Sequence, residues 1–207
     1  MREKSTNLKR TIDFHHDRFT QISESYCGPA VIQMLLHNLG IEVAQAAVAE
    51  AGGAIDLIEQ QGMRVDQLGR AVRQLAPQTC FWYKDHSMME ELVRLVADYD
   101  CPVGIEWQGL FEDTLEDETQ DGDYGHYSVV TMVDSKRRKL VIVDPYKEFR
   151  SQDRTFTFEF FLSRWWDTND FPDPLTGTSH LVEDRQMMFV ITPEEVIFPR
   201  LVDMQKE

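Results

Sequence analysis

The sequence predicts an α+β protein in which an N-terminal helical lobe packs against a C-terminal antiparallel β-sheet lobe. Before residue 100, apolar residues recur at the three- and four-residue spacing of amphipathic helices. After residue 101, short β-branched and apolar runs replace them. With 42% hydrophobic residues among 207, the chain can bury one sizeable core. We therefore expect an arm over residues 1–19 and a single domain over 20–207, divided into a helical lobe at about 20–100 and a sheet lobe at about 101–207.

The helical lobe contains four predicted helices. The first begins near Gly28, where Pro29 suits an early helical position, and stops at Gly40. It carries Val31, Met34, Leu35 and Leu39 at helical spacing. The other three predicted helices span residues 43–51, 64–76 and 87–99.

The sheet lobe contains three predicted strands, a helix and a closing strand. The strands span residues 101–107, 126–133 and 139–144, and the charged run DSKRR at 134–138 is typical of a hairpin turn. Helical spacing returns at residues 157–167, and residues 186–193 form the closing strand. We expect Trp107, Trp165 and Trp166 to belong to the core, since aromatic residues at such spacings are usually buried.

The composition excludes several classes of function. Acidic residues outnumber basic ones by 36 to 21, and a net charge of −15 repels phosphate backbones, so we expect no nucleic acid partner. The chain has no run of eighteen apolar residues and no signal-peptide core, which predicts a soluble, cytoplasmic protein without a membrane span. The three cysteines lack C-x-x-C spacing, so we expect reduced thiols. The sequence predicts no oligomeric state.

The acidic segment at residues 112–123 resembles a calcium loop only in part. Asp117, Thr119, Asp121 and Gly122 match the first, third, fifth and sixth positions of an EF-hand template, but the twelfth position is Ser128 instead of a bidentate acid. We therefore expect a solvated acidic loop, no metal and no cofactor.

Cys27 is the first candidate for chemistry. It stands directly before a predicted helix, where unpaired backbone N–H groups and the helix dipole favour a thiolate. For Cys27 considered alone, the role of a small buried hydrophobic residue is the better explanation, because free cysteines are usually buried.

Three further residues change that balance. Gln21 stands six positions earlier, where its amide could join the Cys27 N–H as an oxyanion donor. His126 opens one predicted strand and Asp144 ends the next, so a hairpin would bring them together as base and orienting acid. Taken singly, His126 could be a hydrogen-bonded sheet residue and Asp144 a turn residue before proline. Together, in this order, the four favour a cysteine nucleophile.

At these residues the sequence resembles the C39-like peptidases of the papain-like cysteine protease superfamily. The matching motifs are Q-x5-C-G-P-A, G-H-Y-S-V-V and V-D-P, and the resemblance spans roughly residues 20–192. It implies a papain-like fold, with Cys27 as nucleophile, His126 as general base and then acid, Asp144 as orienting group and Gln21 as oxyanion donor. Many family members belong to ABC exporters, but the chain shows no P-loop motif, so that role is not expected.

The predicted function is that of a cysteine peptidase or amidase-type hydrolase acting through a thioester on Cys27. The expected substrate is a peptide or amide. The acidic segment before His126 indicates that this substrate could be cationic. Two alternatives stay open: an acyl transferase of transglutaminase-like or phytochelatin-synthase-like type, and a non-catalytic peptide-binding module. His180, in a predicted loop, is the reserve base.

Overall fold

The helices form largely where the sequence places them. In the computed structural model, which describes residues 18–111, 124–172, 178–194 and 196–207, the first helix runs from Cys27 to Asn38. The helical elements are α1 (Cys27–Asn38), α2 (Gln45–Ala51), α3 (Ile58–Gln61), α4 (Val65–Leu75), α5 (Met89–Val93), the π-helix η1 (Arg94–Asp98), the 3-10 helix η2 (Lys147–Phe149), α6 (Phe158–Arg164) and the 3-10 helix η3 (Phe198–Val202). Within the described ranges, no helix is long and apolar enough to cross a membrane.

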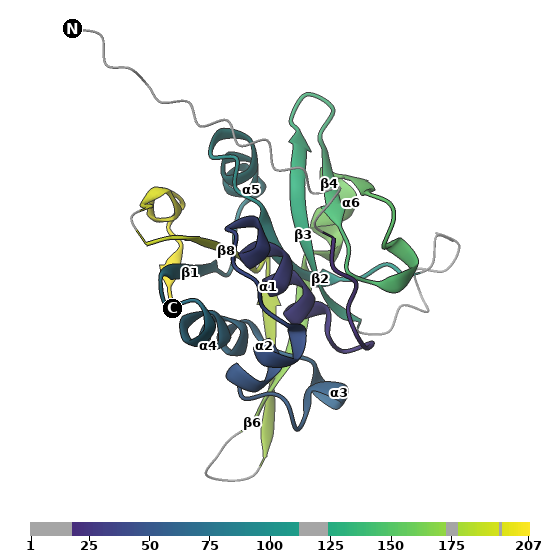
Figure 1. The fold of residues 1–207 in the computed structure, drawn as a ribbon. Helices are drawn as coiled ribbons and strands as arrows, with labels where there is room; N and C mark the ends of the chain where they lie inside the picture. Colours follow the sequence, from purple (N-terminus) through teal and green to yellow (C-terminus); the bar gives the residue numbers. More distant parts are fainter. Residues whose placement is uncertain (1–17, 112–123, 173–177, 195) are drawn as a thin grey trace, which may run out of the picture.

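The strands form one large antiparallel sheet and a separate hairpin (Figure 1). They are β1 (Thr79–Lys84), β2 (Val103–Gln108), β3 (Gly125–Asp134), β4 (Lys139–Val143), β5 (Arg154–Thr157), β6 (Trp166–Pro172), β7 (Ser179–Arg185), β8 (Met188–Pro193) and β9 (Gln205–Lys206). The sheet has the order β5-β4-β3-β2-β8-β1-β9, while β6 and β7 pair with each other. The α+β class is therefore confirmed.

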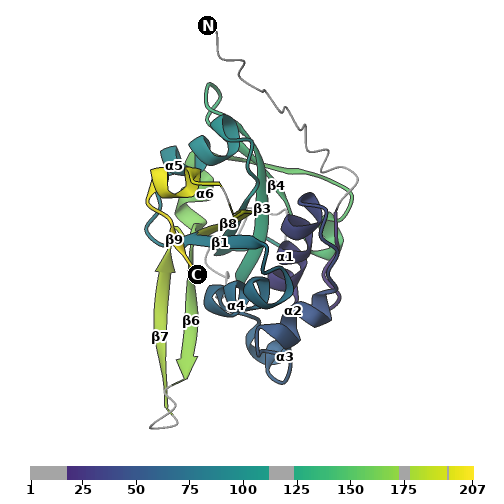
Figure 2. The same cartoon turned by 60° about the vertical axis from the view of Figure 1, so that its left-hand side comes forward.

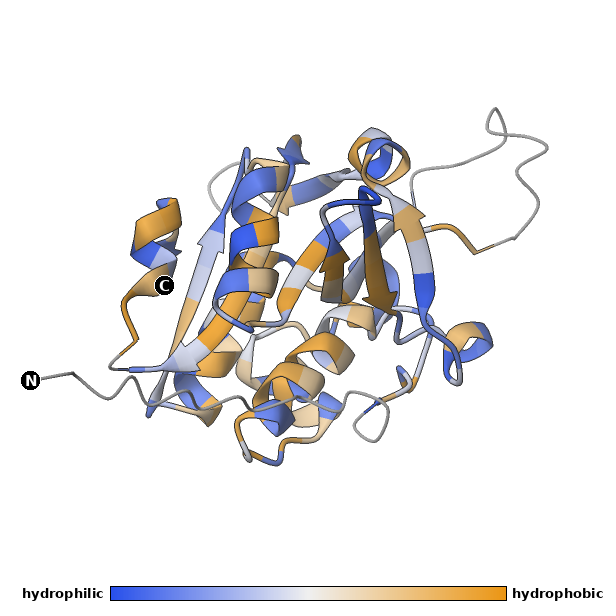
Figure 3. Ribbon diagram, turned by 90° about the horizontal axis from the view of Figure 1, so that it is seen from above, coloured by the Kyte–Doolittle hydropathy of each residue, from blue (hydrophilic) through white to orange (hydrophobic). Residues whose placement is uncertain are grey.

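The large sheet is buried on both faces (Figure 2). Alternate residues of a strand point to opposite faces, so Phe189 and Ile191 of β8 belong to the apolar layer that includes α1, α2 and α4, whereas Met188 and Val190 belong to the layer that includes α5, η1 and α6. The central strands and the helices beside them carry most of the hydrophobic residues, drawn in orange in Figure 3. Two apolar layers therefore fix where the ends of β2 and β3 lie relative to α1.

Several elements differ from the sequence-based expectation. β1 lies within the part expected to be helical, yet it pairs with β8 from Thr79 opposite Pro193 to Lys84 opposite Met188. The helix predicted at 157–167 covers only Phe158–Arg164, and Trp166 begins β6. The hairpin turn at 134–138 is present, with the Asp134 carboxylate accepting from the backbone N–H groups of Lys136 and Arg137. The acidic segment 112–123 and residues 1–17 of the predicted arm lie outside the described residues.

Candidate active site

Cys27 begins α1, and the first N–H groups of a helix have no intrahelical acceptor. The helix start approaches the neighbouring elements closely because Gly28 has no side chain. A Cβ at Gly28 would lie 3.2 Å from Leu68 Cδ2 and 3.3 Å from Tyr127 Cδ2. The thiol of Cys27 is therefore held in a packed site, and the residue is 7% exposed.

The antiparallel pairing of β3 and β4 brings His126 and Asp144 together. Val129 lies opposite Val143, so the start of β3 and the residue after β4 meet at the same end of the sheet. His126 Nε2 and Asp144 Oδ1 are 2.8 Å apart, and both residues are buried. The Cys27 side chain lies close enough to the His126 ring to contribute to the raised pKa of the imidazole. Because Nε2 faces Asp144, Nδ1 is the ring nitrogen available to the sulfur.

The electrostatics of this trio favour a charged imidazole. Burial lowers the pKa of His126, but the charge of Asp144 and the hydrogen bonds with Asp144 and Cys27 outweigh it and raise the pKa to about 10. Burial likewise opposes ionisation of Asp144, yet the charge and hydrogen bond of His126 keep the pKa of Asp144 below its ordinary value. Near neutral pH, His126 therefore presents a positive charge to the sulfur.

Arg154, which the sequence reasoning missed, fixes the other side of the Asp144 carboxylate. Its Nη1 donates to Asp144 Oδ2 at 2.8 Å, and its Nη2 donates to the Leu110 carbonyl at 2.6 Å. The guanidinium lies over the Phe149 ring at 3.7 Å. In the sequence, Arg154 is marked only by its position two residues before Phe156. It lies on β5, a short strand that the sequence pattern did not predict.

Gln21 occupies the loop before α1 but does not hold the donor geometry expected of it. Both hydrogens of its amide are engaged, since Nε2 donates to the carbonyls of Ser23 and Glu24 at 2.8 and 2.9 Å. Its Oε1 is buried and has no hydrogen-bond partner among the described residues. The Gln21 backbone N–H donates to the Pro145 carbonyl at 2.9 Å. That bond ties the Cys27 loop to the residue following Asp144.

Aromatic rings cover the histidine. Phe111 meets the His126 ring edge-on with 5.0 Å between centroids, and it meets the Tyr146 ring in the same way at 4.8 Å. A Cβ added at Gly109 would come within 2.9 Å of His126 Cβ. Apolar contact on this side reduces the access of water to the bond between His126 and Asp144, which strengthens it.

The remaining candidates lie elsewhere. His180, the reserve base, lies on β7 instead of in a loop and is exposed. Trp107 and Trp165 are fully buried core residues, as expected, whereas Trp166, at the start of β6, is only half-buried and does not belong to the core. No three His, Cys, Asp or Glu side chains in the described part of the chain are arranged to hold a metal ion.

Comparison with known proteins gives a family and a fold. The model of the Peptidase_C39 like family matches residues 14–170. The structure is similar to the peptidase domain of Streptococcus ComA, a bi-functional ABC transporter involved in quorum sensing, at 18% identity and a TM-score of 0.55, covering 85% of this chain and 97% of that one. It also matches the N-terminal peptidase C39 like domain of a toxin secretion ATP-binding protein from Vibrio parahaemolyticus, at 11% identity and a TM-score of 0.49, covering 84% and 99%. Comparison with curated proteins finds no match. The likeness to the ComA domain confirms the predicted fold.

Proposed function

Because the chain belongs to the Peptidase_C39 like family, we propose that it is a cysteine peptidase or amidase that cleaves its substrate through a thioester on Cys27. One observation carries this proposal: His126 Nε2 lies 2.8 Å from Asp144 Oδ1, and the Cys27 side chain lies close enough to the same ring to help raise the pKa of the imidazole. A nucleophile, a base and a group that orients the base are the arrangement that nucleophilic catalysis requires.

Each group then has a chemical task. The Cys27 thiolate, stabilised by protonated His126, attacks the carbonyl carbon of the scissile amide. The tetrahedral intermediate collapses when His126 gives its proton to the leaving amine, and neutral His126 then takes a proton from water as water attacks the thioester. The Cys27 backbone N–H is the proposed oxyanion donor. Gln21 can add a second donor only if one of its amide hydrogens leaves the Ser23 or Glu24 carbonyl.

Iodoacetamide alkylation, followed by peptide mass spectrometry over a range of pH, tests the proposal. Cys101 is a matched internal control, because Cys27 and Cys101 are each 7% exposed. Burial, together with the charge of Asp100, raises the pKa of Cys101 to about 12. We expect Cys27 to be alkylated well below pH 8, Cys101 to stay unmodified, and His126→Ala to abolish the difference. If Cys27 and Cys101 react equally in the wild type, the proposed nucleophile is wrong.

Turnover separates the alternatives that share this trio. A peptide library should yield cleaved products with the wild type and none with Cys27→Ala. Products that form only when a primary amine is added would identify an acyl transferase. An alkylated Cys27 without turnover of any library member would favour the peptide-binding module.

A further inference from the structure

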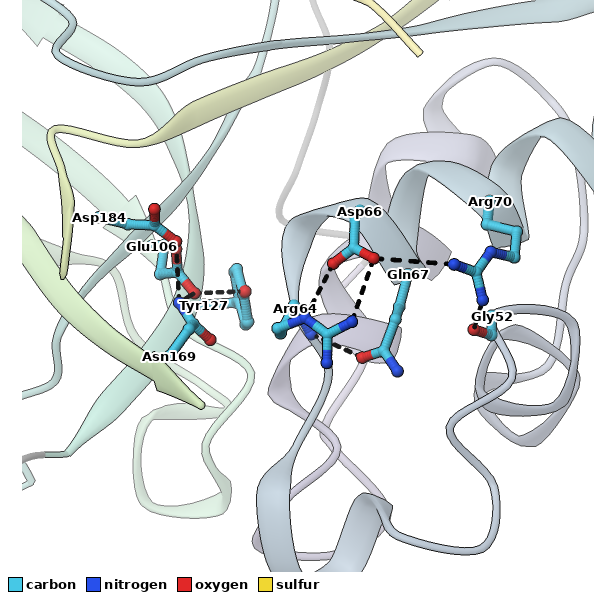
Figure 4. A network of polar contacts seen from close by, with 9 residues as sticks. All are labelled: Gly52, Arg64, Asp66, Gln67, Arg70, Glu106, Tyr127, Asn169 and Asp184. Carbon is cyan, nitrogen blue, oxygen red and sulfur yellow. Dashed lines mark hydrogen bonds and ion pairs between the residues drawn. The ribbon is translucent and has the colours of Figure 1, made fainter. Parts of the chain in front are cut away.

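Three acidic side chains lie together beside the candidate active site. Two of them, Glu106 and Asp184, form no ion pair with a lysine or arginine among the described residues. We call Glu106, Asp167 and Asp184, together with the amide of Asn169, the acidic cluster. Asn169 Nδ2 donates to Glu106 Oε1 at 3.1 Å and to Asp184 Oδ2 at 2.9 Å (Figure 4). Asp167 adds a further negative charge that acts on Glu106. The cluster thus joins β2 to the β6–β7 hairpin.

Tyr127 connects the acidic cluster to the nucleophile. Its hydroxyl donates to Glu106 Oε1, and its ring packs against Gly28, the residue after Cys27. The charge of Cys27 acts directly on Tyr127. Tyr127 follows His126 on β3 and lies opposite Glu106 on β2. The cluster is therefore one side chain away from the start of α1, where Cys27 lies.

The cluster is incompletely satisfied. Glu106 is 1% exposed, and its Oε2 meets no hydrogen-bond donor among the residues that the structure describes. Asp184 and Glu106 both accept from Asn169 Nδ2, so their carboxyl groups lie close together, and they could share a hydrogen bond only while one of them keeps a proton. Burial, followed by the charge of Asp167, raises the pKa of Glu106 well above its usual range. A positive charge close to Glu106 would lower the pKa of this carboxyl group again, against the effects of burial and of the Asp167 charge.

The two arginines labelled in Figure 4 do not supply that charge. Figure 4 shows Arg64 and Arg70 directed at Asp66, with Arg64 Nε 3.0 Å from Asp66 Oδ1 and Arg70 Nη2 3.7 Å from Asp66 Oδ2. Arg64 also stacks on Phe171 at 4.6 Å. No lysine or arginine among the described residues acts on Glu106 or Asp184 as an ion-pair partner.

We propose that the acidic cluster binds a cationic side chain of the substrate, of the guanidinium or ammonium class, next to the bond that Cys27 attacks. This inference rests on the proposed function. Donor groups of the cation would meet Glu106 Oε2 and the carboxylate of Asp184, which is partly exposed and so gives access from solvent. No three ligating side chains of the described residues are placed to hold a metal ion, so the expected ligand is an organic cation.

Matched covalent probes test the proposal. Peptidyl vinyl sulfones would carry either arginine or its neutral isostere citrulline, at the residue next to the warhead in one pair and one residue further in a second pair. The second-order rate of Cys27 modification is followed by intact mass. For at least one pair we expect the arginine probe to react about tenfold faster or more, because only arginine offers a charge partner to the buried Glu106 carboxylate, and close charge pairs can exceed that ratio.

Variants assign the preference to the cluster. Glu106→Gln and Asp184→Asn should each bring the ratio of arginine to citrulline rates close to one. Asp184 is partly exposed, so Asp184→Asn can still test the cluster if Glu106→Gln fails to fold. Glu183→Gln is the control, because Glu183 is exposed on the same strand and pairs with Arg185 at 2.5 Å. It should keep the wild-type ratio.

Each outcome is decisive. A wild-type ratio near one in both pairs, with Cys27 still modified, overturns the cation site and leaves the nucleophile intact. A preference that survives Glu106→Gln and Asp184→Asn also overturns it, since the cation then binds elsewhere. If neither the probes nor iodoacetamide modify Cys27, both the cation site and the proposed function are wrong.

Discussion

Replacing Asp144 by asparagine isolates the contribution of one carboxylate to the charge state of His126. The side chain keeps its size, and its oxygen can still accept a hydrogen bond, but the negative charge is lost. Burial of His126 is unchanged in the variant and by itself lowers the pKa of the imidazole. Since Asp144 is the largest of the groups that raise it, we expect the pKa of His126 to fall well below about 10 in the variant.

The size of the effect follows from the two pKa values. The difference between the ordinary value of 6.5 and about 10 corresponds to on the order of 5 kcal/mol, at about 1.36 kcal/mol per pKa unit. Since the folded-state value is the higher one, this stability is fully present below pH 6.5 and is lost as the pH rises through about 10. Asp144→Asn should lose most of it already near neutral pH.

Two measurements check this prediction. Carbon-detected NMR of the imidazole gives the His126 titration midpoint, and urea unfolding at pH 6, 8 and 10 gives the free energy of unfolding. The wild type should lose more stability than the variant between pH 6 and pH 10, because only the wild type carries the contribution of the His126–Asp144 pair. Asp134→Asn is the control, because Asp134 is half-exposed and its partners lie in the surface turn. If the His126 midpoint in Asp144→Asn stays near that of the wild type, the electrostatic account of the trio is wrong.

Two further predictions concern the buried charges around the site. Arg154→Met leaves Asp144 Oδ2 without its 2.8 Å partner, so the free energy of urea unfolding should fall by about 3–5 kcal/mol, and a loss below about 1 kcal/mol would contradict the role given to Arg154. Glu106→Gln should raise the melting temperature at pH 7 but not at pH 4. The raised pKa of Glu106 lowers stability only as the pH rises above its ordinary value of 4.5, and an equal change at both pH values would contradict this origin.

The sequence predicted those features that depend on local pattern. Cys27 was placed at a helix start because Pro29 and the apolar spacing after it define the first turns. The pairing of His126 with Asp144 was predictable because two strands joined by a short charged turn usually form an antiparallel hairpin. The catalytic roles of these residues and of Gln21 stay predictions.

Features that depend on distant parts of the chain were not predictable. β1 carries Phe81 and Trp82 on opposite faces of the sheet, and both are buried, so it lacks the alternation of polar and apolar residues that marks a half-exposed strand. Arg154 is matched to Asp144 only after β5 pairs with β4. The acidic cluster needs the β6–β7 hairpin laid against β2, which no local pattern encodes.

The place of β8 within the sheet sets the order in which the protein can fold. β8 lies between β2 and β1, yet in sequence it follows every other strand of the large sheet except β9. During synthesis, β1 must therefore wait for residues 188–193, more than a hundred positions later, before it gains its main partner. Pairings of such separation slow folding and leave strand edges exposed meanwhile. The nascent chain thus carries its cysteine, histidine and aspartate long before the sheet that holds them is closed.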